Sequence, residues 1–279
     1  MPYVAEISRT NPTCLLFLID QSSSMAGPVG GSPEKSKADG VADAVNRLLQ
    51  NLALKCAKSD GIRDYFHVGV IGYGADVRSA LGGSLAGRHL VPVSEFANNP
   101  LRVEKRKRRV DDGAGGILEQ TFKFPIWFEP LADGQTPMCQ ALTLACEVLQ
   151  EFINRSPECY PPLVINISDG RASDADPRPA AAAIRDLATT DGQVLLFNAH
   201  LSSEPSVPVV FPAAVDGLPD KYARHLFKMS SPLPPRLLKA ARADGFTVAE
   251  GARGFAFNAD LVSVIRFLDI GTRVAHGGN

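Results

Sequence analysis

Five short, almost wholly apolar runs predict the strands of a buried sheet. The runs are TCLLFLID, YFHVGVIGYG, PLVINISDG, QVLLFNAHL and GFAFNAD, at residues 13–20, 65–74, 162–170, 193–201 and 254–260. Most of them are apolar on both faces, which is typical of a parallel sheet that helices cover on each side. The pattern therefore predicts strands that lie inside the molecule.

Between these runs, apolar residues recur at the spacing of a helix. The patterns cover residues 41–52 and 141–149, PAAAAIRDLATTDG at 179–192, where Asp-Gly is expected to end the helix, and NADLVSVIRFLDIGTRV at 258–274. Strands that alternate with helices predict βαβ units, and hence an α/β fold with a doubly wound, mostly parallel central sheet. The 279 residues, 45% of them hydrophobic, are enough for one large domain with a substantial core.

Two segments depart from this alternation and are expected to be insertions into a single domain that spans residues 1–279. Residues 82–134 contain VEKRKRRVDDGAGGILEQTFKFPIWFEPLADG, which predicts a β-hairpin with its turn at Asp111-Asp112-Gly113. Residues 202–251 are rich in proline at first and then show short helical patterns at 222–229 and 237–243.

Polar residues with oxygen-bearing side chains stand where the predicted strands end. Asp20 closes the first strand and is followed by Ser22 and Ser24, Asp169 closes another strand, and Thr136 precedes a helix in ADGQTPM. In an open α/β sheet, ligands bind at the carboxyl ends of the strands. Two facing carboxylates would repel each other, and a divalent cation removes that conflict. A donor set of hard oxygens favours Mg²⁺, with Mn²⁺ and Ca²⁺ as alternatives.

The same five residues, in the same order, closely resemble the metal-ion-dependent adhesion site of von Willebrand factor type A (vWA) domains. The resemblance implies a Rossmann-like fold in which Ser22, Ser24 and Thr136 touch the metal, while Asp20 and Asp169 act mainly through bound waters. It also implies adhesion without catalysis, with a Glu or Asp of a protein partner completing the metal shell. The chain looks most like stand-alone bacterial vWA proteins of the tellurite-resistance type, which are cytoplasmic and often encoded beside protein kinases, phosphatases or ATPases.

Three other interpretations stay open at this point. The hydroxyls of Ser22, Ser24 and Thr136 could cap helices, with both aspartates solvated. A bound cation could activate water in a metal-dependent phosphohydrolase, although the motif offers no His or Glu as a general base. The metal could also be a purely structural clip.

Several further features bear on the partner and the setting. Arg171 and His200 lie near the proposed site in sequence and are candidates for its partner-binding rim. The formal net charge of -1 gives no field that attracts nucleic acid or anionic lipid. The run KRKRR at 105–109 is expected to lie on an exposed edge strand, where its charges prevent aggregation. No secretory signal or membrane span is visible, and five cysteines without metal spacing fit a reduced, cytoplasmic protein.

Overall fold

The central strand of the sheet is the first apolar run of the sequence. A computed structural model of the chain describes residues 3–29, 32–111, 117–203 and 207–258. All eight residues of strand β1 (Thr13–Asp20) are buried. Odd-numbered side chains such as Phe17 pack into one apolar core, and even-numbered ones such as Leu18 pack into a second. Because successive side chains of a strand point to opposite faces, β1 alone explains why the molecule has a core on each side of the sheet.

Eight of the described strands form the main sheet. They are β1, β6 (Phe66–Tyr73), β7 (Val77–Ser79), β8 (Val91–Pro92), β11 (Leu163–Ser168), β14 (Leu195–His200), β15 (Val209–Val210) and β16 (Phe255–Phe257). Their order is β15-β16-β14-β11-β1-β6-β7, and β8 also pairs with β6. The four pairings from β16 through β14, β11 and β1 to β6 are parallel, while β7, β8 and β15 pair antiparallel to their neighbours. The predicted mostly parallel, doubly wound sheet is confirmed.

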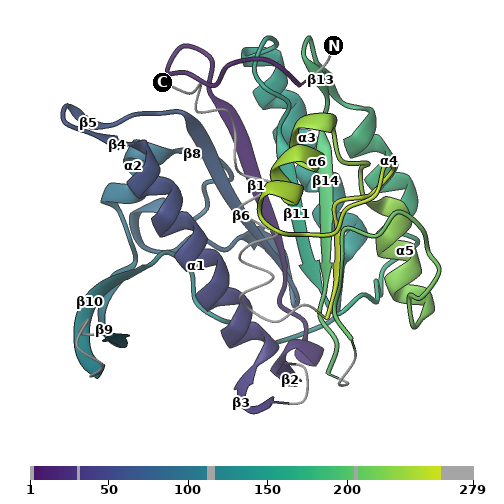
Figure 1. Ribbon diagram of the computed structural model, residues 1–279, viewed down its shortest axis with the longest axis horizontal. Helices are drawn as coiled ribbons and strands as arrows, with labels where there is room; N and C mark the ends of the chain where they lie inside the picture. The colour runs from purple at the N-terminus through teal and green to yellow at the C-terminus, as the bar shows by residue number, and fades with distance from the viewer. Residues whose placement is uncertain (1–2, 30–31, 112–116, 204–206, 259–279) are drawn as a thin grey trace.

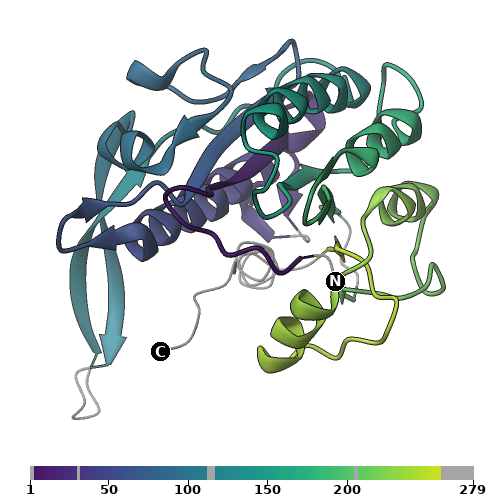
Figure 2. The ribbon, with the colours of Figure 1, turned by 90° about the horizontal axis from the view of Figure 1, so that it is seen from above.

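Helices cover both faces of this sheet, as Figures 1 and 2 show. Helices α1 (Lys37–Cys56), α2 (Val93–Asn98) and α6 (Pro235–Ala243) contribute to one core. Helices α3 (Met138–Arg155), α4 (Arg178–Asp186) and α5 (Lys221–Met229) contribute to the other. Two 3₁₀ turns, η1 (Ser23–Ala26) and η2 (Gly83–Leu85), lie in loops. In the described part of the chain, no helix combines the length and the apolar character that crossing a bilayer requires.

The direction of strand addition reverses beside β1. The chain passes from β1 to β6 on one side of it and later returns to β11 on the other side, from which the sheet continues outward to β14 and β16. At such a switch point the loops that follow the two neighbouring strands separate and leave a crevice at their carboxyl ends. Here those loops follow β1 and β11, at the lower edge of the sheet in Figure 1.

The predicted hairpin is present and projects from the body of the molecule (Figure 1). Strands β9 (Arg102–Asp111) and β10 (Ile117–Ile126) pair antiparallel over their whole length. The predicted turn falls mainly on residues 112–116, which lie outside the described residues. Three shorter two-stranded ribbons are β2 (Pro28–Val29) with β3 (Ser32–Ser36), β4 (Ala57–Lys58) with β5 (Gly61–Ile62), and β12 (Ala188–Thr189) with β13 (Gly192–Gln193).

The helix predictions have different outcomes. The helix expected over 179–192 ends at Asp186, because Leu187 turns to an extended conformation and its carbonyl accepts a hydrogen bond from the Val194 amide. Of the expected Asp-Gly stop, Asp191 lies in the turn between β12 and β13, and Gly192 begins β13. The short helices predicted at 222–229 and 237–243 are confirmed as α5 and α6. The helix expected over 258–274 lies, apart from its first residue, outside the described residues.

Candidate metal site

The loop after β1 gathers hydroxyl groups around a buried carboxylate. Asp20 is fully buried, and its Oδ1 accepts hydrogen bonds from the Ser22 amide at 2.9 Å and from Ser22 Oγ at 2.6 Å. Its Oδ2 accepts from Ser168 Oγ at 2.7 Å. The Oγ atoms of Ser22 and Ser24 are 2.9 Å apart. The two serines of the motif and the first aspartate therefore lie together, as predicted.

The hydroxyl of Ser22 does not serve as a helix cap. Ser22 occupies the N-cap position of η1, but its side chain makes no capping hydrogen bond and donates to Asp20 instead. The N-cap of α3 is Pro137, one residue after Thr136, and it also makes no side-chain cap. Asp174, from the loop after β11, accepts from the Cys139 and Gln140 amides at 3.2 and 3.0 Å and thus satisfies the start of α3. For these helix starts, the capping interpretation is wrong.

Thr136 is held between the other two loops of the site. The Ser23 amide donates to the Gly134 carbonyl at 3.1 Å, which ties the loop before Thr136 to the serine loop. On the other side, the Thr136 amide donates to Ser173 Oγ, and the Ser173 amide donates to the Thr136 carbonyl, both at 2.9 Å. Gly134 has a φ of +83°, and a Cβ there would come within 2.4 Å of the Ala75 backbone. Only glycine suits such a close approach in this conformation.

Asp169 lies directly after β11 and forms an ion pair that the sequence did not predict. Its Oδ2 is 3.2 Å from Nζ of Lys37, the first residue of α1. The Lys37 side chain is 4% exposed and that of Asp169 is 13% exposed. Nothing in the local sequence EKSKADG distinguishes Lys37 from Lys35 two residues earlier. The contact between Lys37 and Asp169 could therefore be found only from the tertiary structure. Ser168 was missed too, because a serine inside an apolar strand gives no chemical signal.

The electrostatics of the site favour a bound cation. Burial, above all, raises the pKa of Asp20 to about 6; the hydrogen bond from Ser22 opposes this shift, and the nearby charge of Asp169 adds to it. Burial also raises the pKa of Tyr73, beneath the site, well above its usual range, and the charges of Asp20 and Asp169 push it in the same direction. Both carboxylates thus act on the same small volume, where a positive charge would relieve the cost of ionising them.

A hard divalent cation suits the residues that converge here. The donors are carboxylate and hydroxyl oxygens, which such ions prefer. The buried Lys37 ammonium already stands beside Asp169 as a positive group. Within the described ranges, no three His, Cys, Asp or Glu side chains cluster in a way that could hold a metal. The hydroxyl groups of Ser22 and Ser24 are oxygen ligands that this edge of the sheet offers in addition to its two carboxylates.

The two predicted rim residues differ in their placement. Arg171 is exposed and lines a cavity of about 390 Å³ together with Lys221 and Tyr222. His200 is buried and stacks on Phe257, with ring centroids 5.0 Å apart. Neither of its ring nitrogens has a hydrogen-bond partner among the described residues, and burial lowers its pKa.

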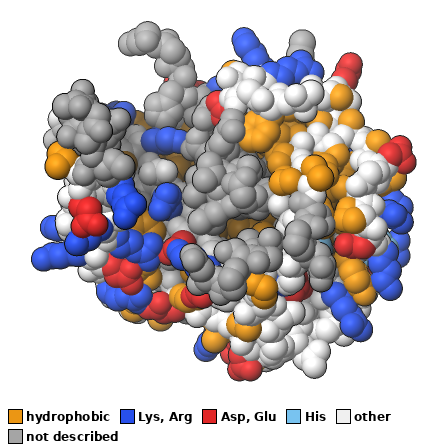
Figure 3. All heavy atoms as spheres, turned by 60° about the horizontal axis from the view of Figure 1, so that its bottom comes forward, with side chains coloured by type: hydrophobic (Ala, Val, Ile, Leu, Met, Phe, Trp, Pro, Cys, Tyr) orange, Lys and Arg blue, Asp and Glu red, His pale blue; other side chains and the backbone are white. Residues whose placement is uncertain are grey.

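The structure therefore places His200 beneath the rim and not on it. A Cβ on Gly170, the residue after Asp169, would lie 2.4 Å from His200 Nε2, so the ring packs directly under the loop that carries Asp169. Figure 3 looks toward this edge of the molecule, where Lys and Arg side chains gather at both sides with acidic ones among them.

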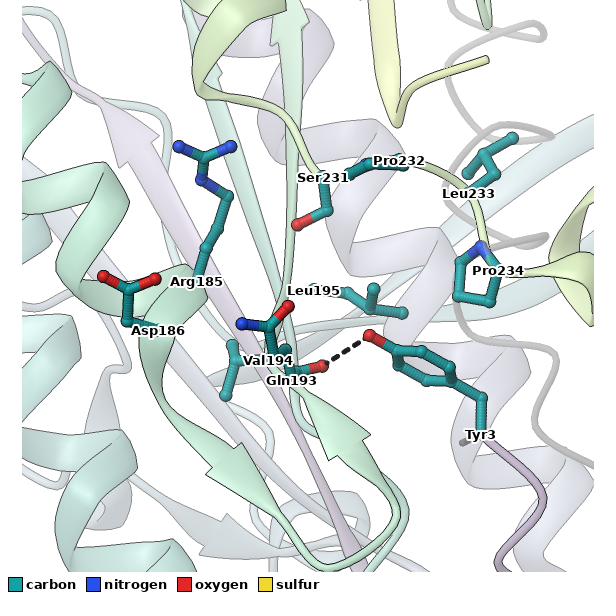
Figure 4. A pocket seen from close by; sticks show the side chains of 10 residues that line it. All are labelled: Tyr3, Arg185, Asp186, Gln193, Val194, Leu195, Ser231, Pro232, Leu233 and Pro234. Atoms are coloured by element: carbon teal, nitrogen blue, oxygen red, sulfur yellow. Dashed lines mark hydrogen bonds between the residues drawn. The ribbon is translucent and has the colours of Figure 1, made fainter. Parts of the chain in front are cut away.

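A second cavity lies at the other end of the sheet. Its volume is about 330 Å³, and its lining includes Tyr3, Arg185 and residues 193–195 at the amino end of β14 (Figure 4). Tyr3 closes one side by donating its hydroxyl hydrogen to the Gln193 carbonyl at 3.1 Å. This cavity is far along the strand from the carboxyl ends that carry Asp20 and Asp169, so it is not part of the candidate metal site.

Comparisons with known proteins give weak structural matches. No protein-family model and no curated protein matches the sequence. Matching solved structures include a manganese-loaded TRAP protein of Plasmodium vivax, with 14% identity, a TM-score of 0.45, and coverage of 100% of this chain and 83% of that one. An aerotolerance-related membrane protein of Bacteroides fragilis has 13% identity, a TM-score of 0.35, and coverage of 75% and 77%. The vWF domain of the type V pili tip protein Mfa5 of Porphyromonas gingivalis has 13% identity and a TM-score of 0.34. The match covers 58% of this chain and 39% of that one.

Similarities at this level assign neither a family nor a ligand to the chain. The α/β fold rests on the strand order described above, and the resemblance to vWA domains rests on the residues of the site.

Proposed function

We propose that this protein is a vWA-type interaction module that binds a divalent cation, Mg²⁺ in the cell, and docks an acidic residue of a protein partner through it. The proposed metal residues are Asp20, Ser22, Ser24, Thr136 and Asp169. The proposal is supported above all by one observation: the loops that carry these residues come together at the switch point of the sheet, around carboxylates that already hold a buried ammonium group.

Each residue has a distinct part in this proposal. Ser22, Ser24 and Thr136 offer neutral hydroxyl oxygens to the metal, and Asp20 holds Ser22 in place through its hydrogen bonds. Ser168 holds Asp20 in turn and is itself fixed by the Gly170 amide, which donates to Ser168 Oγ at 2.9 Å. Asp169 supplies the second carboxylate. When bound, the cation provides a Lewis-acidic centre that is short of negative charge and accepts a carboxylate from outside.

Binding without catalysis is the function that these groups support best. The nearest histidine, His200, has both ring nitrogens buried beneath Gly170, so it does not reach a substrate at the surface as a general base. The competing hypothesis is a metal-dependent phosphohydrolase. Steady turnover of a generic phosphoester such as p-nitrophenyl phosphate, lost in Asp20→Ala, would replace our proposal with that one.

The test of docking is co-purification from the native host in Mg²⁺ and in EDTA. We expect a partner that is retained by the wild type in Mg²⁺ and released by EDTA, and that is absent with Asp20→Ala or Thr136→Ala. Asp43→Ala, which removes a carboxylate outside the site, is the matched control and should retain the partner. A partner retained equally under all conditions contradicts metal-bridged docking. If chelation lowers thermal stability but leaves the partner bound, the metal is a structural clip.

We extend the proposal to the cellular setting that the resemblance suggests. The protein would act in the cytoplasm, in a kinase-, phosphatase- or ATPase-linked stress or signalling system of the tellurite-resistance type. All five cysteines are free, which is consistent with a reducing compartment. Identification of the co-purified partner by mass spectrometry tests this setting, and a secreted or envelope protein as the partner would overturn it.

A further inference from the structure

Lys37 is buried at the candidate metal site although its side chain is charged. It begins α1, and its amide donates to the Gly27 carbonyl at 2.8 Å, which joins the start of the helix to the end of the serine loop. This position brings the side chain to Asp169, 132 residues away in the sequence. Lysine is almost never fully buried unless it is paired, because removing its charge from water is costly.

The neighbouring Lys35 shows what an ordinary lysine does at this helix start. Its side chain is 58% exposed and pairs with Asp43 at 2.7 Å on the surface of α1. Both lysines come from the same short segment, and both pair with a carboxylate. The ion pair of Lys37 is almost withdrawn from water, whereas that of Lys35 remains largely solvated. Screening by water is therefore weak for Lys37, and its charge acts strongly on anything bound beside Asp169.

We propose that Lys37 is the built-in counter-ion of the metal site and competes with the metal for Asp169. This inference rests on the proposed metal binding and goes further, because it assigns a role to a residue outside the five-residue motif. Without metal, the ammonium group neutralises one of two neighbouring carboxylates and keeps the empty site stable. With metal, three positive charges face two negative ones, so the cation binds less tightly than the motif alone would allow.

This arrangement has two consequences for ligand choice. A monovalent cation gains too little from the two carboxylates to displace or accompany the ammonium group, so the site discriminates in favour of divalent ions. The excess positive charge that remains after a divalent ion binds is removed by an incoming carboxylate. Metal and acidic partner should therefore strengthen each other's binding, as reciprocal linkage requires.

The decisive experiment measures Mg²⁺ and Mn²⁺ binding by isothermal titration calorimetry for the wild type and for Lys37→Met. We expect Lys37→Met to bind both ions at least about tenfold more tightly, because a nearby positive charge has been removed. Lys35→Met removes the same charge at the surface and should stay within about twofold of the wild type. Lys37→Arg keeps the charge and should also remain close to the wild type.

A second readout does not depend on the affinity. In EDTA, Lys37→Met should melt at a lower temperature than the wild type, because Asp169 and the buried Asp20 then lack a counter-ion. Saturating Mg²⁺ should restore more of its stability than it adds to the wild type. Lys37→Gln, a neutral polar variant, replaces Lys37→Met if circular dichroism shows that the latter is unfolded.

The outcomes separate this inference from the proposed function. If the wild type and the variants bind Mg²⁺ with the same affinity, or if Lys37→Met binds it more weakly than the wild type, the proposed competition between Lys37 and the metal is refuted. The proposed metal site itself is then still supported. If neither the wild type nor Lys37→Met binds Mg²⁺ or Mn²⁺, the proposed metal function itself is refuted. Tighter binding by Lys37→Met, with Lys35→Met unchanged, supports both.

Discussion

Two groups of charged residues flank the start of α1, and they differ chiefly in how far water reaches them. The inner group is the candidate metal site, where Lys37 pairs with Asp169 beside buried Asp20. The outer group, called here the hairpin cluster, consists of Lys35, Asp43, Glu104 and Arg106, and it joins α1 to the β9–β10 hairpin. Arg106 bonds Asp43 at 2.8 Å and Glu104 at 2.9 Å, and its guanidinium lies 3.8 Å from the centroid of the Phe124 ring.

The same ion-pair chemistry has different consequences in the two groups. In the hairpin cluster every charge keeps some contact with solvent, so its pairs cost little to form and contribute modest stability. In the inner group the charges are mostly desolvated, and each depends on its neighbours for neutralisation. A protein gains little stability from such an arrangement, and that is why we interpret the inner group as a binding site and the hairpin cluster as a structural joint.

The largest expected difference between the groups concerns removal of a carboxylate. Asp20→Ala removes the acceptor of three buried hydrogen bonds, two from Ser22 and one from Ser168, and should lower the free energy of unfolding by about 4 kcal/mol. Asp43→Ala should cost about 1 kcal/mol, because its cations remain solvated. Urea unfolding in EDTA measures both values. Equal losses would contradict the distinction between the two groups.

The two groups should also respond to pH with opposite signs. The pKa of Asp20 is raised to about 6 in the folded protein. In EDTA, its contribution to stability is therefore fully present below its unfolded pKa of about 3.9 and is lost as pH rises through about 6. The free energy of unfolding should fall by up to about 3 kcal/mol over this range. Partial burial alone would raise the pKa of Asp43, but hydrogen bonds from Lys35 and Arg106 outweigh burial and lower it. Its contribution is therefore present above its unfolded pKa and lost as pH falls through the lowered folded pKa.

Isosteric amides isolate these two contributions. In urea unfolding between pH 4 and pH 7, the stability of Asp20→Asn relative to the wild type should rise with pH, since the wild type loses stability as Asp20 ionises and the amide does not titrate. Asp43→Asn should be less stable than the wild type at pH 7, with the difference shrinking toward pH 4. A pH profile of the same sign for both carboxylates would refute the assignment of their environments.

A pair of glycines tests whether the site loop is packed more tightly than the outer region. Gly134 and Gly87 both have positive φ, +83° and +78°, but a Cβ at Gly134 would strike the Ala75 backbone, whereas a Cβ at Gly87 meets nothing within 4 Å. Gly87→Ala should cost about 1 kcal/mol of backbone strain, and Gly134→Ala about 2 kcal/mol more. Gly134→Ala should also weaken Mg²⁺ binding, because it displaces the loop that carries Thr136. Calorimetric binding and thermal unfolding of both variants check this.

The smallest effect is expected at the far end of the hairpin. Lys107 and Glu119 pair at 2.8 Å across β9 and β10, and both side chains are mostly exposed. Glu119→Gln should change the free energy of unfolding by less than about 0.5 kcal/mol, and the change should vanish in high salt, since the pair is screened. A larger loss of unfolding free energy that does not depend on salt would show that the exposed part of the hairpin contributes to stability as much as the buried groups do.

Much of the fold was predictable because its determinants are local. Apolar runs with both faces buried predicted the central parallel strands, including β1, β6, β11 and β14, with bounds close to those observed. The helix after residue 179 was predicted too long, because the end of α4 depends on the pairing of Leu187 with Val194 in the following ribbon. The Asp174 cap of α3 was also missed, since it comes from a loop 35 residues away.

The sequence by itself determined which oxygen-bearing residues stand at the strand ends, because strand length and the position of the following polar residue are local properties. It also determined that Asp20 and Asp169 would be neighbours if their strands paired in parallel. Only the tertiary structure decided that His200 lies beneath the rim, and that Lys37 is buried against Asp169 while Lys35 stays exposed. Burial and charge pairing depend on contacts between distant segments, and two lysines in one short segment carry no local signal that separates them.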